Sequence, residues 1–420
     1  MPSRLRARLR ATLTTAFTTA ALLALPNAAH AQPASTEPDF EQQILFKAAQ
    51  DPGYACFRIP AIVKTTDGTL LAFAEGRVLN CGDAADIDIV LKRSTDGGRT
   101  WGPLQVVTHG GGDTHGNPAP IVDRETGRIL LAETWNTGRT DSASCSVPCD
   151  RTPHLQYSDD DGTTWSEPRD LSDEILPADW NSWYATGPVH GIQLTRGRHA
   201  GRLVFGVNTE TWKGSRVAAN HAALIVSDDG GDHWRIGATD SWPIADDGTF
   251  RQKPSETTLA ERTDGSILVS GRETDGTDLG HRTQAVSHDG GDSFTAPFHD
   301  LPDLYTPMVQ GSVLRLGDRL LLACPGDPDR RRTMMIRSSY DGGRTWDSVD
   351  RGTVVTTDWS GYSDMARIDH DTVGLMYEGG AVDARDEIRF ARFTEDWLQP
   401  RRGPDPVSYT HLTLPTIYSV

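Results

Sequence analysis

An eight-residue pattern that recurs five times limits what this chain can fold into more than any other feature. Each copy has Ser at its first position, Asp at its third, Gly at its fifth and an aromatic residue at its eighth. The copies are STDGGRTW (94–101), SDDDGTTW (158–165), SDDGGDHW (227–234), SHDGGDSF (287–294) and SYDGGRTW (339–346). Repetition over tens of residues is typical of a protein built as an array of similar units.

Short runs of β-branched and large apolar residues precede each octet and predict strands. The runs that open with a turn residue are 68–76, 127–135, 201–208, 265–273, 318–326 and 371–379. A further run follows each of them, and the sixth such run, 387–394, has no octet after it. Almost no segment has the 3.6-residue period of an amphipathic helix. The chain is therefore predicted to be all-β, as one six-bladed β-propeller over residues 42–398.

The octets themselves are predicted to be structural. In each, the Asp side chain can accept hydrogen bonds from the backbone of its own turn, and Gly tolerates a positive φ. The final Trp or Phe can pack between neighbouring blades. A catalytic interpretation would require five copies of one active site, so the octets are interpreted as scaffold.

The two ends of the chain are predicted to lie outside this domain. Four Arg residues, the apolar run 16–26 and Ala29-His30-Ala31 are typical of a secretory signal peptide over residues 1–31. Residues 32–41 are expected to be a linker, and residues 399–420 a tail that is disordered or foreign to the natural gene. Cleavage after Ala31 would change the formal net charge from −17 to −21, because it removes four Arg and no acidic residue.

Charge and hydropathy narrow the classes of partner and the expected location. An acidic surface argues against nucleic acid and anionic membranes. No run after residue 31 reaches the ~18 apolar residues of a membrane span. The mature protein is therefore expected to be soluble, and the signal peptide predicts that it is secreted.

The five cysteines are too few for a fold that depends on disulfides, although export permits them. Cys145 and Cys149 share one loop, and Cys324 in a strand-like run is expected to be a small buried apolar residue. Cys56 and Cys81 are predicted to fall on the same end of one blade, so a disulfide between them is geometrically sensible.

Chemistry-bearing residues are predicted to gather at one end of the propeller. In an up-and-down blade, the start of the first strand, the end of the second and the loop after it lie at the end opposite the octets. Arginines, carboxylates and a tyrosine from four blades fall there: Arg58, Arg77, Asp83, Glu256, Arg272, Arg330–Arg332, Tyr362 and Glu378. Trp135 and Tyr184 fall there too, as sugar contacts or as packing between blades.

With these residues in place, the chain resembles the bacterial exo-α-sialidases (neuraminidases). The resemblance covers nearly all of the mature domain. It is carried by Phe-Arg-Ile-Pro at 57–60, by the octets, which correspond to the Asp-boxes (BNR repeats) of that family, and by two pairs of residues 16 positions apart. These pairs are Glu256 with Arg272, and Tyr362 with Glu378.

The resemblance implies a role for each residue at this end. Arg58, Arg272 and Arg331 would bind the carboxylate of sialic acid through planar guanidinium groups. Glu378 would orient Arg58, and Arg77 would lie near the sugar. Arg331 is the choice among three adjacent arginines, and Asp83 the choice among Asp83, Asp86 and Asp88.

The resemblance also implies a mechanism that needs no metal and no cofactor. Tyr362 would be the nucleophile, because a neutral phenol avoids repulsion by the substrate carboxylate. Tyr is a poor nucleophile at its ordinary pKa of ~10, so Glu256 would act as its base. Asp83 would protonate the leaving oxygen and later activate water. The expected reaction is hydrolysis of terminal α-linked sialic acids with retention of configuration.

Other functions stay open at this point. A trans-sialidase would share the same residues and differ in how an acceptor competes with water. A non-catalytic sialoglycan-binding propeller would be expected to lack Tyr362, Glu256 or Asp83, and a propeller acting on a neutral sugar would leave the arginines without a purpose. The expected partners are sialylated glycoproteins, glycolipids and oligosaccharides, and the protein is expected to be a monomer.

Overall fold

The computed structural model describes residues 39–276, 280, 282–301 and 303–398, and its regular structure is almost entirely β. The helices in this part of the chain are α1 (Ser172–Ile175), η1 (Gly197–His199) and η2 (Glu395–Trp397). None of the helices in these residues is long and apolar enough to cross a membrane. The all-β class is confirmed. The predicted signal peptide and C-terminal tail lie outside the described residues.

The strands form antiparallel sheets in which sequence neighbours pair. The largest sheet contains β2 (Cys56–Lys64), β3 (Leu70–Arg77), β4 (Ile87–Ser94), β5 (Gln105–Thr108), β6 (Thr114–Val122), β7 (Ile129–Asn136), β8 (Thr152–Ser158) and β9 (Arg169–Asp170). The next contains β10 (Ala185–Thr186), β11 (Ile192–Gln193), β12 (Leu203–Lys213), β13 (Arg216–Ser227) and β14 (Arg235–Pro243).

The second half of the chain forms three four-stranded sheets. One contains β15 (Pro254–Glu261), β16 (Ile267–Glu273), β17 (Arg282–Ser287) and β18 (His299–Asp300). Another contains β19 (Ser312–Leu316), β20 (Arg319–Pro325), β21 (Met334–Ser339) and β22 (Thr353–Val354). The last contains β23 (Trp359–Arg367), β24 (Thr372–Gly380), β25 (Glu387–Thr394) and β1 (Phe40–Phe46).

The eight-stranded sheet divides naturally into two groups, β2–β5 and β6–β9. They are joined by one parallel pair, Ile87 of β4 with Thr114 of β6, whereas every other pairing in the sheet is antiparallel. With that pair taken as a junction, the described strands fall into six successive antiparallel groups. This grouping supports the predicted six blades.

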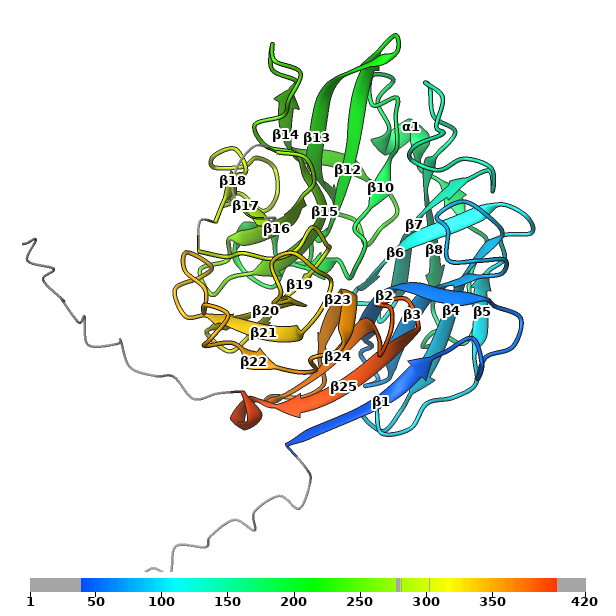
Figure 1. Ribbon diagram of the computed structural model, residues 1–420, viewed down its shortest axis with the longest axis vertical. Helices are drawn as coiled ribbons and strands as arrows, with labels where there is room; N and C mark the ends of the chain where they lie inside the picture. Colours follow the sequence, from blue (N-terminus) through cyan, green and yellow to red (C-terminus); the bar gives the residue numbers. More distant parts are fainter. Residues whose placement is uncertain (1–38, 277–279, 281, 302, 399–420) are drawn as a thin grey trace, which may run out of the picture. The chain divides into compact units, whose positions relative to one another are not determined.

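The first and last strands of the described chain lie side by side. β1 pairs antiparallel with β25, with Phe40 opposite Phe393, and Figure 1 shows the blue strand along the red one. β1 begins at Phe40, inside the segment predicted to be a linker. Because β1 completes the sheet that contains β25, the two ends of the described part of the chain hold each other in place.

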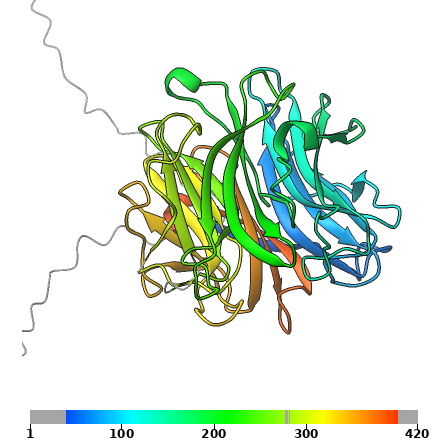
Figure 2. The ribbon, with the colours of Figure 1, turned by 90° about the horizontal axis from the view of Figure 1, so that it is seen from above.

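The core lies between successive sheets, and the first strand of each group is mostly buried in it. Ile62 and Ala72 of the first group pack with Met376 and Ile388 of the last in one apolar cluster. In Figures 1 and 2 the green pair β12 and β13 lies between the cyan strands and the yellow ones. Sheets stacked on both sides explain why all but the last residue of β2 and every residue of β3 are buried.

The five octets have the predicted scaffold geometry. The Ser94 hydroxyl donates to Asp96 Oδ1 at 2.8 Å and accepts from Gly98 N at 2.8 Å, and the same two bonds recur in the other four octets. Gly98 has a φ of 87°, and a Cβ there would lie 2.3 Å from a ring carbon of Phe390. Trp101 packs edge-on against Phe390 of β25, so this octet ties the first group of strands to the last.

Candidate active site

The first strands of four groups carry a β-bulge near their starting ends. Pairing with the second strand shifts between Arg58 and Ala61 in β2, and shifts at corresponding places in β6, β15 and β23. Ile59, Asn117 and Glu256 have positive φ values of 56°, 55° and 41° at or beside these shifts. A bulge turns a side chain out of the alternating strand pattern, so these strands can direct polar groups along the strand end.

Tyr362 and Glu256 meet across two sheets. The Tyr362 hydroxyl donates a short hydrogen bond to Glu256 Oε1, although the residues are 106 positions apart. Arg272 donates from Nη1 to Glu256 Oε2 at 2.8 Å and to the Tyr362 hydroxyl at 3.2 Å. Glu256 is held in its left-handed conformation by a bond from its own N–H to Asn208 Oδ1 at 3.0 Å. Sequence reasoning did not identify Asn208.

Burial controls the protonation of this tyrosine. Tyr362 is 7% exposed, and burial raises its pKa well above the ordinary value. The Glu256 carboxylate raises the pKa further, against the opposing effect of Arg272, Arg58 and Arg331. The phenol is therefore neutral at physiological pH, and Glu256 is the group placed to accept its proton.

Arg58 is fixed by Glu378. The guanidinium donates from Nε to Glu378 Oε1 at 3.0 Å and from Nη2 to Oε2 at 3.3 Å, and the Glu378 side chain is fully buried. Glu378 also accepts from the backbone N–H groups of Ile59 and Tyr362 at 3.1 and 3.2 Å. Burial alone would raise the pKa of Glu378, but Arg58 and the N–H of Ile59 hold it below its usual range.

Asp83 lies beside two of the predicted arginines. Its Oδ1 accepts from Arg77 Nη1 at 2.7 Å and from Arg58 Nη1 at 3.4 Å, while its side chain is 60% exposed. Partial burial opposes ionisation, but the charges of Arg77 and Arg58 outweigh it and lower the Asp83 pKa. Asp88 instead accepts from the Tyr54 hydroxyl and from the N–H of Gly110.

Glu75 is a residue that sequence reasoning missed. Arg77 is 2% exposed, and its Nε and Nη2 donate to Glu75 Oε2 at 3.0 and 2.5 Å. Glu75 also accepts from the N–H of Asn117, which lies at the bulge of the next group. A carboxylate inside the apolar run 68–76 was the available signal, because such a residue is rarely buried unless it has a partner.

Arg331 is the member of its triplet that reaches the tyrosine. Its guanidinium lies 5.5 Å from the centre of the Tyr362 ring, and Arg58 lies 5.1 Å from the same ring. Arg331 donates to the Met308 carbonyl at 3.2 Å, whereas Arg332 stacks on Trp359. The structure thus brings the predicted residues of four groups together around one phenol.

Arg151 and Tyr184 are buried, and Arg151 lies near enough to Asp83 to lower its pKa. Arg151 donates to the Tyr184 carbonyl at 2.8 Å and to Asn117 Oδ1 at 3.0 Å, and it was not identified from the sequence. Tyr184 is fully buried in an apolar cluster, so its ring packs in the core. Of the two interpretations left open for Tyr184, packing is the one that the structure supports.

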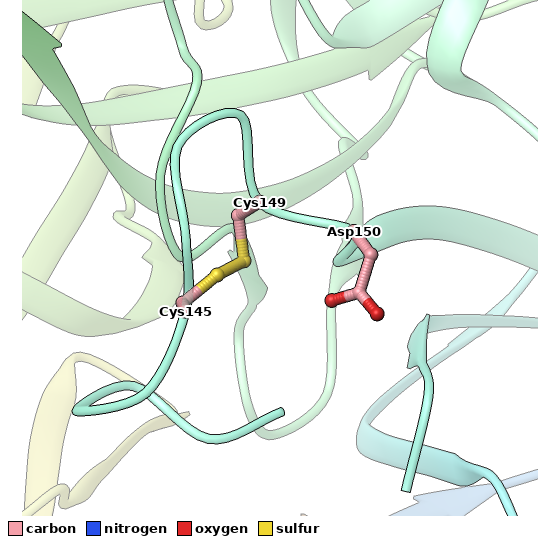
Figure 3. Close-up of side chains that lie close together, drawn as sticks. All are labelled: Cys145, Cys149 and Asp150. Carbon is pink, nitrogen blue, oxygen red and sulfur yellow. A yellow bond between two sulfur atoms is a disulfide. The ribbon is translucent and has the colours of Figure 1, made fainter. Parts of the chain in front are cut away.

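Two disulfides are present in the described residues. Cys56 and Cys81 are joined, which anchors the loop that carries Asp83 to the start of β2. Cys145 and Cys149 are also joined, with Asp150 beside them (Figure 3). Because both of those sulfur atoms are in a disulfide, this group offers no thiolate ligand to a metal ion. Cys324 is free and fully buried, as predicted.

The two disulfides should differ in their effect on stability. Cross-linking Cys56 to Cys81 closes a loop of sequence separation 25, against 4 for Cys145 to Cys149. Replacing the first pair by Ser is expected to lower the free energy of unfolding by about 3 kcal/mol, and replacing the second pair by less. Urea unfolding of the two double variants beside the oxidised wild type measures this. An equal loss in both would contradict the explanation by loop length.

Comparison with known proteins agrees with this geometry. The BNR repeat-like domain family matches residues 68–373. An exo-alpha-sialidase of Aspergillus fumigatus is 30% identical over 391 residues, which cover 82% of this chain and 86% of the relative. The chain belongs to the sialidase family.

A second curated relative and a solved structure also match most of this chain, but each is longer than the part that is matched. A sialidase of Micromonospora viridifaciens is 32% identical over 388 residues, which cover 87% of this chain but 55% of the relative. The chain therefore spans about half the length of that sialidase. Among solved structures, the Hadza microbial sialidase Hz136 is 28% identical with a TM-score of 0.71, covering 84% of this chain and 68% of the other.

An intramolecular trans-sialidase from Ruminococcus gnavus has a TM-score of 0.70 at 19% identity, over 85% of this chain and 98% of the other. At that identity the likeness shows only that the two proteins share a fold. Family membership is thus established for this chain.

Proposed function

We propose that this sialidase-family protein is a secreted exo-α-sialidase that hydrolyses terminal α-linked sialic acids of glycoconjugates with retention of configuration. The observation that carries the proposal is the Tyr362 hydroxyl bonded to Glu256, with Arg58, Arg272 and Arg331 around it. A neutral buried phenol beside a carboxylate base is the arrangement that a tyrosine nucleophile needs. Secretion is proposed from the N-terminal segment of the sequence.

In the proposed reaction, the arginine cluster binds the substrate carboxylate, which lies on the carbon that reacts. Glu256 accepts the phenol proton as Tyr362 attacks that carbon and the bond to the leaving oxygen breaks. Asp83 gives its proton to the leaving oxygen, and in the second step it takes a proton from the water that displaces Tyr362. Tyr362 then recovers its proton from Glu256, so the enzyme returns to its starting state.

Asp83 must be protonated to act first as an acid, although Arg77 and Arg58 favour its ionised form in the free protein. Binding of the substrate carboxylate supplies a negative charge beside Arg58. That charge offsets part of the attraction between Arg58 and Asp83, and so raises the Asp83 pKa in the complex. Substrate binding would thus favour the protonated form of Asp83, which is the form that acts as the acid.

The test determines which anomer of sialic acid the protein releases first. Purified protein is incubated with sialyllactose, and NMR records which anomer of free sialic acid appears before mutarotation. The proposal expects the α-anomer first. Release of the β-anomer first would contradict retention, and transfer to added lactose in preference to water would indicate a trans-sialidase. Binding of the sugar without any release would indicate a non-catalytic propeller.

A further inference from the structure

A second polar cavity lies at the other end of the first strands. It has a volume of about 540 Å³, and residues at the ends of β2, β15, β19 and β23 line it. Lys64, which lines this cavity, and Arg58 of the candidate active site are six residues apart in β2. At ~3.3 Å per residue the two sites are about 20 Å apart along the strand. The cavity is therefore separate from the arginine cluster around Tyr362.

The charged side chains of this cavity are mostly basic, in a chain whose formal net charge is −17. Four cationic and two acidic side chains line it: Lys64, Arg124, Arg315 and Arg367, with Asp67 and Glu261. The cations come from four different strand groups. Such a concentration of like charges favours binding of an anion, since the low-dielectric walls of a cavity strengthen the local field.

Of the two acidic residues in the wall, Asp67 is exposed and Glu261 is engaged by neutral donors. Glu261 accepts from the backbone N–H groups of Thr195 and Arg196 at 2.9 to 3.0 Å, and from the Thr195 hydroxyl at 2.5 Å. Its charge is therefore directed at backbone amides. No bond joins Glu261 to any of the four cations in the described part of the chain.

The cations that line the cavity have no hydrogen bond to a carboxylate among the described residues. Lys64 donates to the Ile368 carbonyl, and Arg367 donates to the carbonyls of Asp369 and His370 at 2.7 and 3.1 Å. Arg315 makes one long bond of 3.4 Å to the Gly317 carbonyl. Burial lowers the pKa of Arg315, and repulsion from Arg196 and Arg367 acts in the same direction, against a weaker attraction to Glu261 and Asp318. A carbonyl oxygen carries no net charge, so in the described residues none of these three cations is bonded directly to a carboxylate.

His190 adds a donor to the wall of the cavity when its imidazole is protonated. Burial lowers the pKa of His190, but the Asp364 carboxylate outweighs burial and raises it, which favours the protonated form. Its Nδ1 is 2.7 Å from Asp364 Oδ1, and its backbone N–H donates to Asp364 Oδ2 at 3.1 Å. Asp364 is fully buried and also accepts from Ile62 N and the Ser312 hydroxyl, which ties three first strands together. The imidazole is thereby held in one orientation, and its Nε2 has no bonded partner among the described residues.

We propose that this cavity binds a small polyanion bearing phosphate or carboxylate groups, held by Arg315, Arg367 and His190 with Lys64 and Arg124 at the rim. A ligand with several charges suits the cavity better than a single ion, because the cations stand on separate strand groups. The proposal does not depend on the proposed sialidase activity, because the two sites share no residue.

The experiment is isothermal titration of the full chain with pyrophosphate and, separately, with citrate. We expect the wild type to bind at least one of them. Arg315→Gln/Arg367→Gln is expected to bind that anion at least tenfold more weakly. Lys213→Gln/Arg216→Gln is the control, because it also removes two positive charges but from exposed positions of the hairpin between β12 and β13. This variant should bind the anion as the wild type does. Matching melting temperatures of the variants would show that both are folded.

A third variant, Arg331→Gln, separates this cavity from the arginine cluster near Tyr362. The proposal expects it to keep the affinity of the wild type for the anion. Failure of the wild type to bind either anion at millimolar concentration overturns the proposal. So does an equal loss in the hairpin variant, or loss in Arg331→Gln with binding kept in Arg315→Gln/Arg367→Gln. The relative affinity for the two anions would identify phosphate or carboxylate as the preferred group.

Discussion

Replacing Tyr362 by Phe is expected to lower kcat for release of sialic acid from sialyllactose by at least ~10³-fold. The change removes one oxygen atom, the one that donates to Glu256 and accepts from Arg272. The arginines around the ring keep their other partners, so affinity for the substrate carboxylate should change little. Initial rates of sialic acid release measure kcat, and titration of the variant with sialyllactose measures binding.

The matched control is Tyr157 of β8, which lies next to an octet and outside the candidate site. Tyr157→Phe removes a hydroxyl from a 40% exposed side chain that stacks with Arg128 near an octet. It should leave kcat unchanged. If Tyr362→Phe kept kcat within tenfold of the wild type, Tyr362 would not be the nucleophile, whatever its position in the site.

Glu378→Ala is expected to lower the free energy of unfolding by about 3–5 kcal/mol. The reason is that Arg58, itself 7% exposed, would lose both of its bonds to this carboxylate and keep only the long contact of 3.4 Å with Asp83. Two backbone N–H groups would lose their acceptor as well. Urea unfolding at neutral pH measures the loss, with Glu167→Ala at an exposed position as the control, expected within ±0.5 kcal/mol.

The same pair predicts a dependence on pH. The pKa of Glu378 is lower in the folded protein than its usual value, so ionised Glu378 stabilises the fold above the unfolded pKa of ~4.3. That contribution is lost as the pH falls through the folded pKa. The difference in unfolding free energy between wild type and Glu378→Gln should therefore shrink below about pH 4. A difference that stays constant down to pH 3 would mean that the ion pair does not stabilise the protein.

Much of the fold was predictable from local pattern, because strands and turns have local causes. The octets predicted their own hydrogen bonds, since Ser, Asp and Gly act within one turn of chain. The alternation of apolar runs with turn residues predicted the antiparallel pairing of neighbouring strands. β1 was not predicted, because its partner β25 lies more than 340 residues along the chain and no local pattern records that pairing.

The residue types of the candidate site were also predictable. Arg58, Glu256, Tyr362 and Glu378 were placed at one end of the strands by counting strands and turns, and the structure brings them together. Their partners Glu75 and Asn208 were not identified. Asn208 acts through one bond to Glu256 in another sheet, and such a bond has no signature in the spacing of the chain. Glu75 bonds Arg77 two positions along the same strand, so only its contact with the N–H of Asn117 was beyond local pattern.

The amino-acid sequence by itself determined the all-β class, the scaffold role of the octets and the residues that gather at one end of the strands. Only the tertiary structure decided which arginine of the triplet reaches Tyr362, how Asp83 is held, and that a basic cavity lies at the opposite end. The physical reason is that repeats and turns depend on neighbours in the chain. Protonation and charge pairing depend instead on burial and on groups that folding brings from distant segments.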